Sequence, residues 1–387
     1  MWKRDYSSNL ETASRHTSSL VFEFGQAFVR VGIAGESAPR VVIPIISLHQ
    51  EEDEVKSIHH SFWKSNFSIV GNSNKQYCTS CAIVMDNTKN HTWNADDDDD
   101  DDTIRSGRLL SWLSNLYTYQ LFIKPKSRRV VVIFPTSYPP KLQYQLQKTL
   151  KDLEVPAVYF THVFHAIPYA IGSRAGIIID IGQQEARMAA YFDGIMSEET
   201  LQIVPFGYAN CIRILASQRN KTREQVIKDV HSLDEETTKI LYSDYLFNLH
   251  LHDSIMYAFL TMLSKCSIDL RRHALESVSF VGGGVKSLPN FEKEFVKHLL
   301  YLYEKSPSEA STHSDGSALQ PSSRYPYRVK DRNYARFDCL GISIMSWMNV
   351  IQLKFHPASM AWVGGSIMAS IKTDRMKWIH SIESIQD

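Results

Sequence analysis

Residues 176–194, GIIIDIGQQEARMAAYFDG, decide the fold of this chain. Two apolar runs flank a short polar link that contains Gly182, a pattern typical of a β-hairpin. Asp193 and Gly194 form a turn signal at its end. Asp180 closes the first run beside Gly182, and exposed backbone N–H groups there would suit a phosphate and a divalent metal. An ordinary hairpin with an exposed acid is the simpler interpretation of this stretch alone.

An earlier stretch, residues 19–35, repeats the same pattern as SLVFEFGQAFVRVGIAG. A strand ends on Glu23 and Gly25, and the returning strand carries Arg30. This self-similarity predicts two related halves, each offering one glycine-containing hairpin to a shared ligand. Arg30 is either a phosphate ligand or a solvated strand residue. Pro44 is expected to break the sheet that follows.

Composition restricts the class of protein. Lys and Arg total 42 residues and Asp and Glu also total 42 in this 387-residue chain, so no basic excess indicates nucleic-acid binding. Its first residues lack the apolar core of a secretory signal. The chain contains no run of about 18 apolar residues, so no membrane-spanning helix is predicted. The five cysteines are odd in number and scattered, which favours a reduced cytosolic protein. Cys78 and Cys81 have the spacing of a zinc pair, but no second pair follows, so we interpret the spacing as chance.

Three segments are polar. Residues 1–18 are expected to be disordered. Residues 47–103 carry a weak pattern and include the unbroken run Asp96–Asp102, whose carboxylates repel one another and indicate a solvated loop rather than a metal site. Residues 303–335 contain a Ser-rich stretch and are predicted to be a flexible insertion.

Strands and helices alternate elsewhere, as in an α/β domain. A buried strand at 129–135, an amphipathic helix at 142–153 and a strand at 155–160 lead to an apolar helix. Thr161 could cap that helix and Pro168 should kink it.

The second half of the chain contains more helix. Thr222 begins a capping-box pattern, and Asp234 begins an acidic helix start. A strand at 277–281 ends on three glycines, which suit either a tight turn or a close ligand. An apolar strand at 360–363 is expected before a Gly-Gly pair that allows close helix packing.

The order of these pieces resembles the actin superfamily, from about residue 19 to 372 except for 47–103 and 303–335. The most specific stretches are VGIAGESAPR at 31–40 and WVGGSIMASI at 362–371. Cys266-Ser-Ile-Asp269-Leu-Arg-Arg and the strand that enters Gly282 also match.

This resemblance implies an α/β fold of the actin, hexokinase and Hsp70 type, with a nucleotide cleft between two domains. The small domain would comprise 19–171 and 357–387, with 47–103 as a divergent, acidic outer region. The large domain would comprise 172–356, with the insertion at 303–335.

The resemblance also implies ATP or ADP with Mg²⁺ as a cofactor, in a role that could be structural only. By position it implies these nucleotide contacts: Glu23, Gly25, Gln26, Arg30, Asp180, Gly182, Gln183, Gln184, Gly282, Gly283 and Gly284. It assigns no catalytic residue and no metal ligand in this chain.

Several positions depart from the family pattern. Glu23 is one methylene longer than the expected acid, and Gln26 and Ala27 replace Ser and Gly. In the second hairpin Gln183 and Gln184 replace an acid and a Gly, so their side chains crowd the phosphate position.

The residues that would position a catalytic water align with Val163 and Arg187. Valine cannot orient a water, and arginine stays charged and cannot act as a base. A shifted alignment would bring in His162 or His165, for which an ordinary buried or surface histidine is the alternative. We therefore expect a non-catalytic protein with a degenerate ATPase site.

Within the superfamily, the altered hairpins and the acidic outer region resemble the actin-related subunit of dynactin. That resemblance implies a cap on the pointed end of its actin-like filament, in dynein-driven transport along microtubules. The expected partners are filament and pointed-end complex subunits, and indirectly dynein and microtubules, in the cytoplasm and cytoskeleton. No nucleic acid and no membrane insertion are expected.

Two alternatives remain open. One is an actin-related subunit of a nuclear chromatin-remodelling complex, although no Lys/Arg cluster of the nuclear-localisation kind is evident. The other is an ATP-hydrolysing actin that forms filaments. The presence of Val163 and Arg187 at the water-positioning places is evidence against this alternative.

Overall fold

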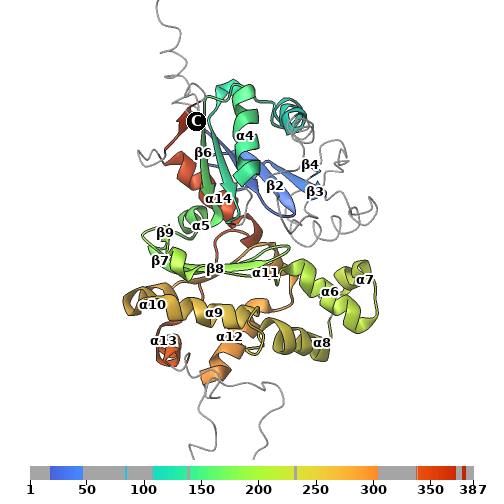
Figure 1. Ribbon diagram of the computed structural model, residues 1–387, viewed down its shortest axis with the longest axis vertical. Helices are drawn as coiled ribbons and strands as arrows, with labels where there is room; N and C mark the ends of the chain where they lie inside the picture. Colours follow the sequence, from blue (N-terminus) through green and yellow to red (C-terminus); the bar gives the residue numbers. More distant parts are fainter. Residues whose placement is uncertain are drawn as a thin grey trace, which may run out of the picture. The chain divides into compact units, whose positions relative to one another are not determined.

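The computed structural model describes residues 18–46, 83–84, 107, 109–136, 140–230, 233–303, 337, 339–371 and 377–380. They fall into two compact units, each with its own sheet (Figure 1). The first unit holds the described residues up to Gly172 and from Ser359 onward, and the second holds Ser173–Ala358. The predictions for Asp96–Asp102, Cys78, Cys81 and most of 303–335 lie outside the described residues.

The sheet of the first unit has the order β12-β6-β5-β1-β2-β3-β4. Its strands are β1 (Leu20–Phe24), β2 (Phe28–Ile33), β3 (Val41–Ile46), β4 (Ile83–Val84), β5 (Val130–Phe134), β6 (Ala157–His162) and β12 (Ile379–His380). Strand β1 pairs antiparallel with β2 and parallel with β5, which confirms the predicted hairpin and the buried strand at 129–135. Every residue of β1 and β5 is buried, because both strands lie inside the sheet, and all of them except Glu23 are apolar.

The expectation that Pro44 ends the sheet was wrong. Strand β3 continues through Pro44, which pairs with Phe28 of β2. On its other side β3 pairs with β4 only at Ile45 and Ile46. Among the described residues Pro44 therefore faces one strand, and a proline is tolerated at such an edge because no ladder hydrogen bond is lost.

Helices α5 and α14 lie side by side in the first unit (Figure 1). The helical elements of this unit include η2 (Leu116–Leu121), η3 (Pro125–Ser127), α4 (Pro140–Asp152), α5 (Val163–Ile171) and α14 (Met360–Ser370), and η9 (Pro357–Ser359) precedes α14. The strand expected at 360–363 is the first turn of α14 instead. Its Gly-Gly pair does allow close packing, since a Cβ on Gly364 would lie 2.0 Å from the Ala166 carbonyl oxygen.

The cap of α5 differs from the prediction. His162 rather than Thr161 is its N-cap, and no side-chain hydrogen bond caps it. Pro168 lies within the helix, which runs from Val163 to Ile171, and the kink at this proline stays a prediction.

The sheet of the second unit has the order β10-β8-β7-β11, with β9 paired to β8. Its strands are β7 (Ala175–Ile181), β8 (Ala186–Phe192), β9 (Ile195–Met196), β10 (Gln202–Val204) and β11 (Val278–Val281). The predicted hairpin of residues 176–194 is β7–β8. Asp193 and Gly194 form its exit turn with φ of 53° and 76°, the left-handed conformation that Asp and Gly tolerate.

Helices cover this second sheet, and α9 and α10 contact β8 (Figure 1). The helical elements are η4 (Glu198–Thr200), α6 (Tyr208–Arg219), α7 (Arg223–Asp229), α8 (Glu235–Ile240), η6 (Leu241–Leu246), α9 (Ile255–Lys265), α10 (Ile268–Leu275), α11 (Gly283–Ser287), α12 (Phe291–Tyr303) and α13 (Leu340–Trp347). Two predicted helix starts are confirmed: Thr222 forms a complete capping box with Gln225, and α8 begins at the predicted acidic start, where Asp234 is the N-cap. Among the described residues, no helix has the length and apolar character needed to cross a membrane.

Candidate functional site

The first hairpin places Glu23 directly opposite Arg30. Arg30 Nη1 donates a hydrogen bond of 2.8 Å to Glu23 Oε1, and the two side chains are only 7% and 8% exposed. Arg30 is therefore not a solvated strand residue, and its positive charge pairs with Glu23 inside the hairpin. Gly25 and Gln26 lie half-buried in the turn, where the Gly25 N–H donates to the Phe28 carbonyl at 2.9 Å.

The second hairpin repeats this arrangement. Asp180 lies directly opposite Arg187, and Arg187 Nη1 is 3.5 Å from Asp180 Oδ2. Arg187 Nε also donates to Glu185 Oε1 at 2.7 Å. The Arg187 side chain is 4% exposed, so one buried guanidinium contacts two carboxylates.

The backbone of the second turn is held against the start of α6. The carbonyls of Gly182, Gln183 and Gln184 accept hydrogen bonds from the N–H groups of Tyr208, Ala209 and Gly207. The Gly182 N–H donates to the Glu185 carbonyl at 3.0 Å, which closes the turn. Gln183 is half-buried and Gln184 is exposed.

The glycine-rich turn after β11 packs against the end of β7. Gly282 has a φ of +92°, and a Cβ there would lie 2.4 Å from Asp180 Oδ1. A Cβ on Gly284 would lie 2.5 Å from Ile181 Cγ2. These glycines let two segments of the protein approach each other, so internal packing accounts for them without a ligand. Gly283 is the first residue of α11.

Within the second unit, the structure brings Asp180 together with Gly282, as the resemblance implies, and it adds Arg187 and Glu185. Within the first unit it joins Glu23 to Arg30. The sequence interpretation assigned no partner to either arginine and did not name Glu185. A usable signal was present, because in both hairpins an arginine follows the acid by seven residues.

The residues present do not fit a divalent cation at either turn. Mg²⁺ is bound through carboxylate oxygens, but Glu23 and Asp180 each face a guanidinium of their own hairpin. In the part of the chain that the structure describes, no cluster of three or more His, Cys, Asp or Glu side chains is arranged to hold a metal. No chemical step through Mg²⁺ is therefore derived for this protein.

The two histidines near the start of α5 lie against each other, with ring centroids 3.7 Å apart. Burial, with a smaller contribution from the charge of His165, lowers the pKa of His162 to about 4. His162 is thus neutral at physiological pH. Val163, beside it, is buried and offers no polar atom to a water.

Comparisons with known proteins agree with this fold. The family model described as Actin matches residues 14–227, more than half of the chain. The SWI/SNF and RSC complexes subunit arp42 of Schizosaccharomyces pombe is 22% identical over 185 residues, covering 46% of this chain and 38% of that protein. Actin-related protein 4 of the same organism is 22% identical over 220 residues, covering 54% and 44%. The chain thus spans less than half the length of either relative.

These relatives correct the narrower expectations. The relative whose complexes are named is a subunit of SWI/SNF and RSC. The prediction of a dynactin cap with filament, pointed-end, dynein and microtubule partners was therefore wrong. The predicted cytoplasmic and cytoskeletal location was wrong for the same reason. Neither relative supports the finer likeness to actin-related protein 10 of dynactin.

The predicted α/β fold class is confirmed by the two sheets with their helices and by the family match. ATP or ADP with Mg²⁺ is typical of this family. The chain belongs to the actin family.

Proposed function

We propose that this protein is a non-catalytic, actin-related subunit of a nuclear chromatin-remodelling complex. The observation that carries the proposal is its similarity to arp42, a subunit of the SWI/SNF and RSC complexes. A subunit of this kind acts through its surfaces. It needs the packed actin fold and does not need nucleotide turnover.

The chemistry at two positions supports the non-catalytic part of the proposal. Val163 has only an apolar side chain and is buried. Arg187 is bound to Glu185 and Asp180, so it can neither accept a proton nor turn toward a water. General-base activation of water requires a group that can accept a proton within hydrogen-bond reach, and neither residue provides one.

Affinity purification of the full-length, tagged protein from nuclear and cytosolic extracts tests the assembly. We expect mass spectrometry of the nuclear eluate to identify the ATPase subunit and other members of a remodelling complex. Recovery of cytoskeletal filament subunits in their place, from the cytosolic eluate, would overturn the proposal. A tag-only extract is the control for background binding.

Phosphate release from ATP by the purified chain tests catalysis separately. We expect a rate equal to that of a protein-free blank. A matched variant, Arg187→His with Val163→Gln, introduces an imidazole and an amide at the two positions and tests whether polar groups there are enough to give phosphate release. Phosphate release by the unmodified chain above the blank would contradict the non-catalytic assignment. The partner assignment would then still depend on the affinity purification alone.

A further inference from the structure

The two hairpins share one arrangement that is independent of the partner question. In each, an acid lies near the end of the first strand, and an arginine lies directly opposite on the returning strand. The pairs are Glu23 with Arg30 and Asp180 with Arg187. Because they occupy equivalent places in two separate units, they are two instances of one arrangement.

Burial makes these arginines necessary to their carboxylates. The Glu23 and Arg30 side chains are 8% and 7% exposed, and those of Arg187 and Asp180 are 4% and 13% exposed. A carboxylate taken out of water requires a compensating positive charge and hydrogen-bond donors. A guanidinium supplies both, since it stays charged at all physiological pH values and carries five donors.

The second hairpin shows the compensation most fully. Arg187 contacts Asp180 through Nη1 and Glu185 through Nε, so it bridges the acid that ends β7 and the acid before β8. Bridging two carboxylates across a turn is also what a divalent cation does. With one positive charge, the side chain therefore makes contacts with two carboxylates of the kind that a metal makes.

We propose that Arg30 and Arg187 are built-in cations that replace a divalent metal in the two hairpins. The protein consequently folds and retains its stability without a divalent cation and without a metal–nucleotide complex. A metal added to the protein finds Glu23 and Asp180 already paired with a guanidinium and does not bind there.

The first test is thermal unfolding of the full-length chain in EDTA, in Mg²⁺ and in Mg²⁺ with ATP. A ligand present at about 100 times its Kd would raise the Tm by several degrees in a protein of this size. We expect the three Tm values to agree within about 1 °C, which is below that effect. A Tm that rises by several degrees with Mg²⁺, or with Mg²⁺ and ATP, overturns the proposal.

Substitution of Arg187 then tests whether its guanidinium takes the place of a bound metal cation. Arg187→Gln leaves Asp180 and Glu185 without their positive partner, so we expect a lower Tm in EDTA and partial recovery in Mg²⁺ or Ca²⁺. Arg174→Gln is the matched control, because Arg174 pairs with Asp193 at the far, exposed end of the same hairpin. No recovery of Arg187→Gln by either cation would show a purely structural ion pair and would overturn the replacement of a metal.

A further variant tests whether the response to added cations arises at this hairpin or at another acidic stretch such as Asp96–Asp102. In the triple variant Asp180→Asn, Glu185→Gln and Arg187→Gln, both carboxylates and the guanidinium are removed, so the cation response should disappear. A response that persists in this triple variant arises elsewhere and counts against the proposal. The unmodified protein decides the metal question even where Arg187→Gln does not fold. None of these measurements depends on the partner complex, so their failure is distinguishable from failure of the proposed function.

Discussion

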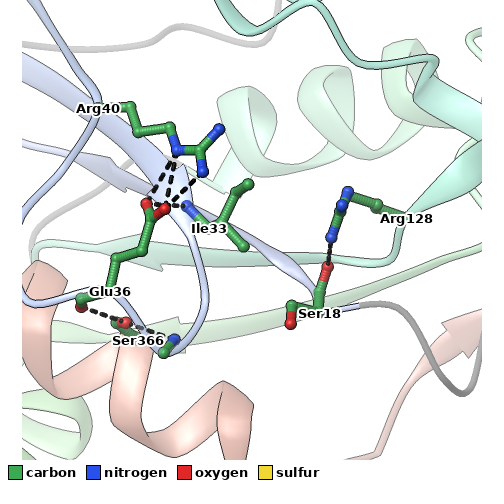
Figure 2. Close-up of polar contacts among 7 residues, drawn as sticks. Ser18, Ile33, Glu36, Arg40, Arg128 and Ser366 are labelled. Atoms are coloured by element: carbon green, nitrogen blue, oxygen red, sulfur yellow. Dashed lines mark hydrogen bonds and ion pairs between the residues drawn. The ribbon is translucent and has the colours of Figure 1, made fainter.

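Ser366 on α14 accepts a hydrogen bond of 2.9 Å from the backbone N–H of Gly35, 331 positions earlier in the chain. Its own hydroxyl donates to the Glu36 carbonyl at 2.8 Å (Figure 2). One buried hydroxyl thus joins residues 31–40 to residues 362–371, the two stretches that carry the resemblance to actin. The Glu36 side chain holds the same turn by accepting from Arg40 and from the Ile33 N–H. Burial raises the pKa of Glu36, but these hydrogen bonds outweigh it and leave the pKa below its usual value.

Replacing Ser366 by alanine is expected to lower the free energy of unfolding by about 1–3 kcal/mol, because the Gly35 N–H and the Glu36 carbonyl lose their partner. Urea unfolding measures the change. Ser370→Ala is the control, since the Ser370 hydroxyl bonds only to carbonyls of its own helix and its loss should change stability by about 0.5 kcal/mol or less. Equal effects of the two substitutions would contradict this account of Ser366.

Gly364→Ala is expected to destabilise the protein although alanine is the better helix former by about 1 kcal/mol. The added Cβ would lie 2.0 Å from the Ala166 carbonyl oxygen of α5, and backbone cannot move aside as a flexible side chain can. Overpacking of this kind costs about 1–3 kcal/mol or more. Thermal unfolding should show a lower Tm. Gly107→Ala, whose Cβ would meet nothing within 4 Å, should leave it unchanged or higher.

His162 should make stability dependent on pH in a defined direction. Its pKa is lowered from 6.5 to about 4, chiefly by burial and in part by the charge of His165. The unfolded chain therefore takes up a proton below pH 6.5 that the folded chain does not. The contribution of His162 is complete above pH 6.5 and is lost as the pH falls toward 4.

Urea unfolding at a series of pH values between 7 and 4 checks this expectation. One proton gives a slope of at most about 1.4 kcal/mol per pH unit. His162→Gln should reduce the slope in this window. His380→Gln, which removes an exposed imidazole from β12, should leave it as in the unmodified protein. A slope unaffected by His162→Gln would show that other groups cause the acid response.

Cysteine alkylation should be selective among three of the described thiols. Burial raises the pKa of Cys211 to about 12 and that of Cys266 to about 11, although Arg271 lowers the latter slightly. The thiolate is the reactive form, so both should resist iodoacetamide in the native state. Cys339 is exposed and should react first. Peptide mass spectrometry over time measures the order, and denaturation in urea should abolish it. Native Cys211 that reacts as fast as Cys339 would contradict the burial.

Local chemistry predicted much of the fold. The two hairpins follow from apolar runs separated by glycine turns, and the capping box at Thr222 follows from residues three positions apart. The first turn of α14 was predicted as a strand because a four-residue apolar run fits both structures. The contact with α5 decides in favour of a helix, and that contact is made between residues about 200 positions apart.

The candidate site was predicted less completely, for a physical reason. Which side chains face each other in a hairpin depends on strand register, which depends on the length of the turn. The sequence interpretation therefore placed Asp180 and Glu23 among the nucleotide contacts and left Arg30 either as a phosphate ligand or as solvated. Once the register is known, each arginine lies directly opposite its acid. Counting seven residues from each acid would have suggested both pairs.

The contact of Arg187 with Asp180 has a consequence for timing. A bound metal–nucleotide can be exchanged, cleaved and released, so the turn that holds it can differ between a newly assembled subunit and an old one. A guanidinium is attached to the chain by covalent bonds, so it is neither exchanged nor released. On the proposal that Arg187 replaces a metal, the β7–β8 turn does not change through nucleotide exchange or cleavage, so a molecule that binds beside it meets the same surface at all times.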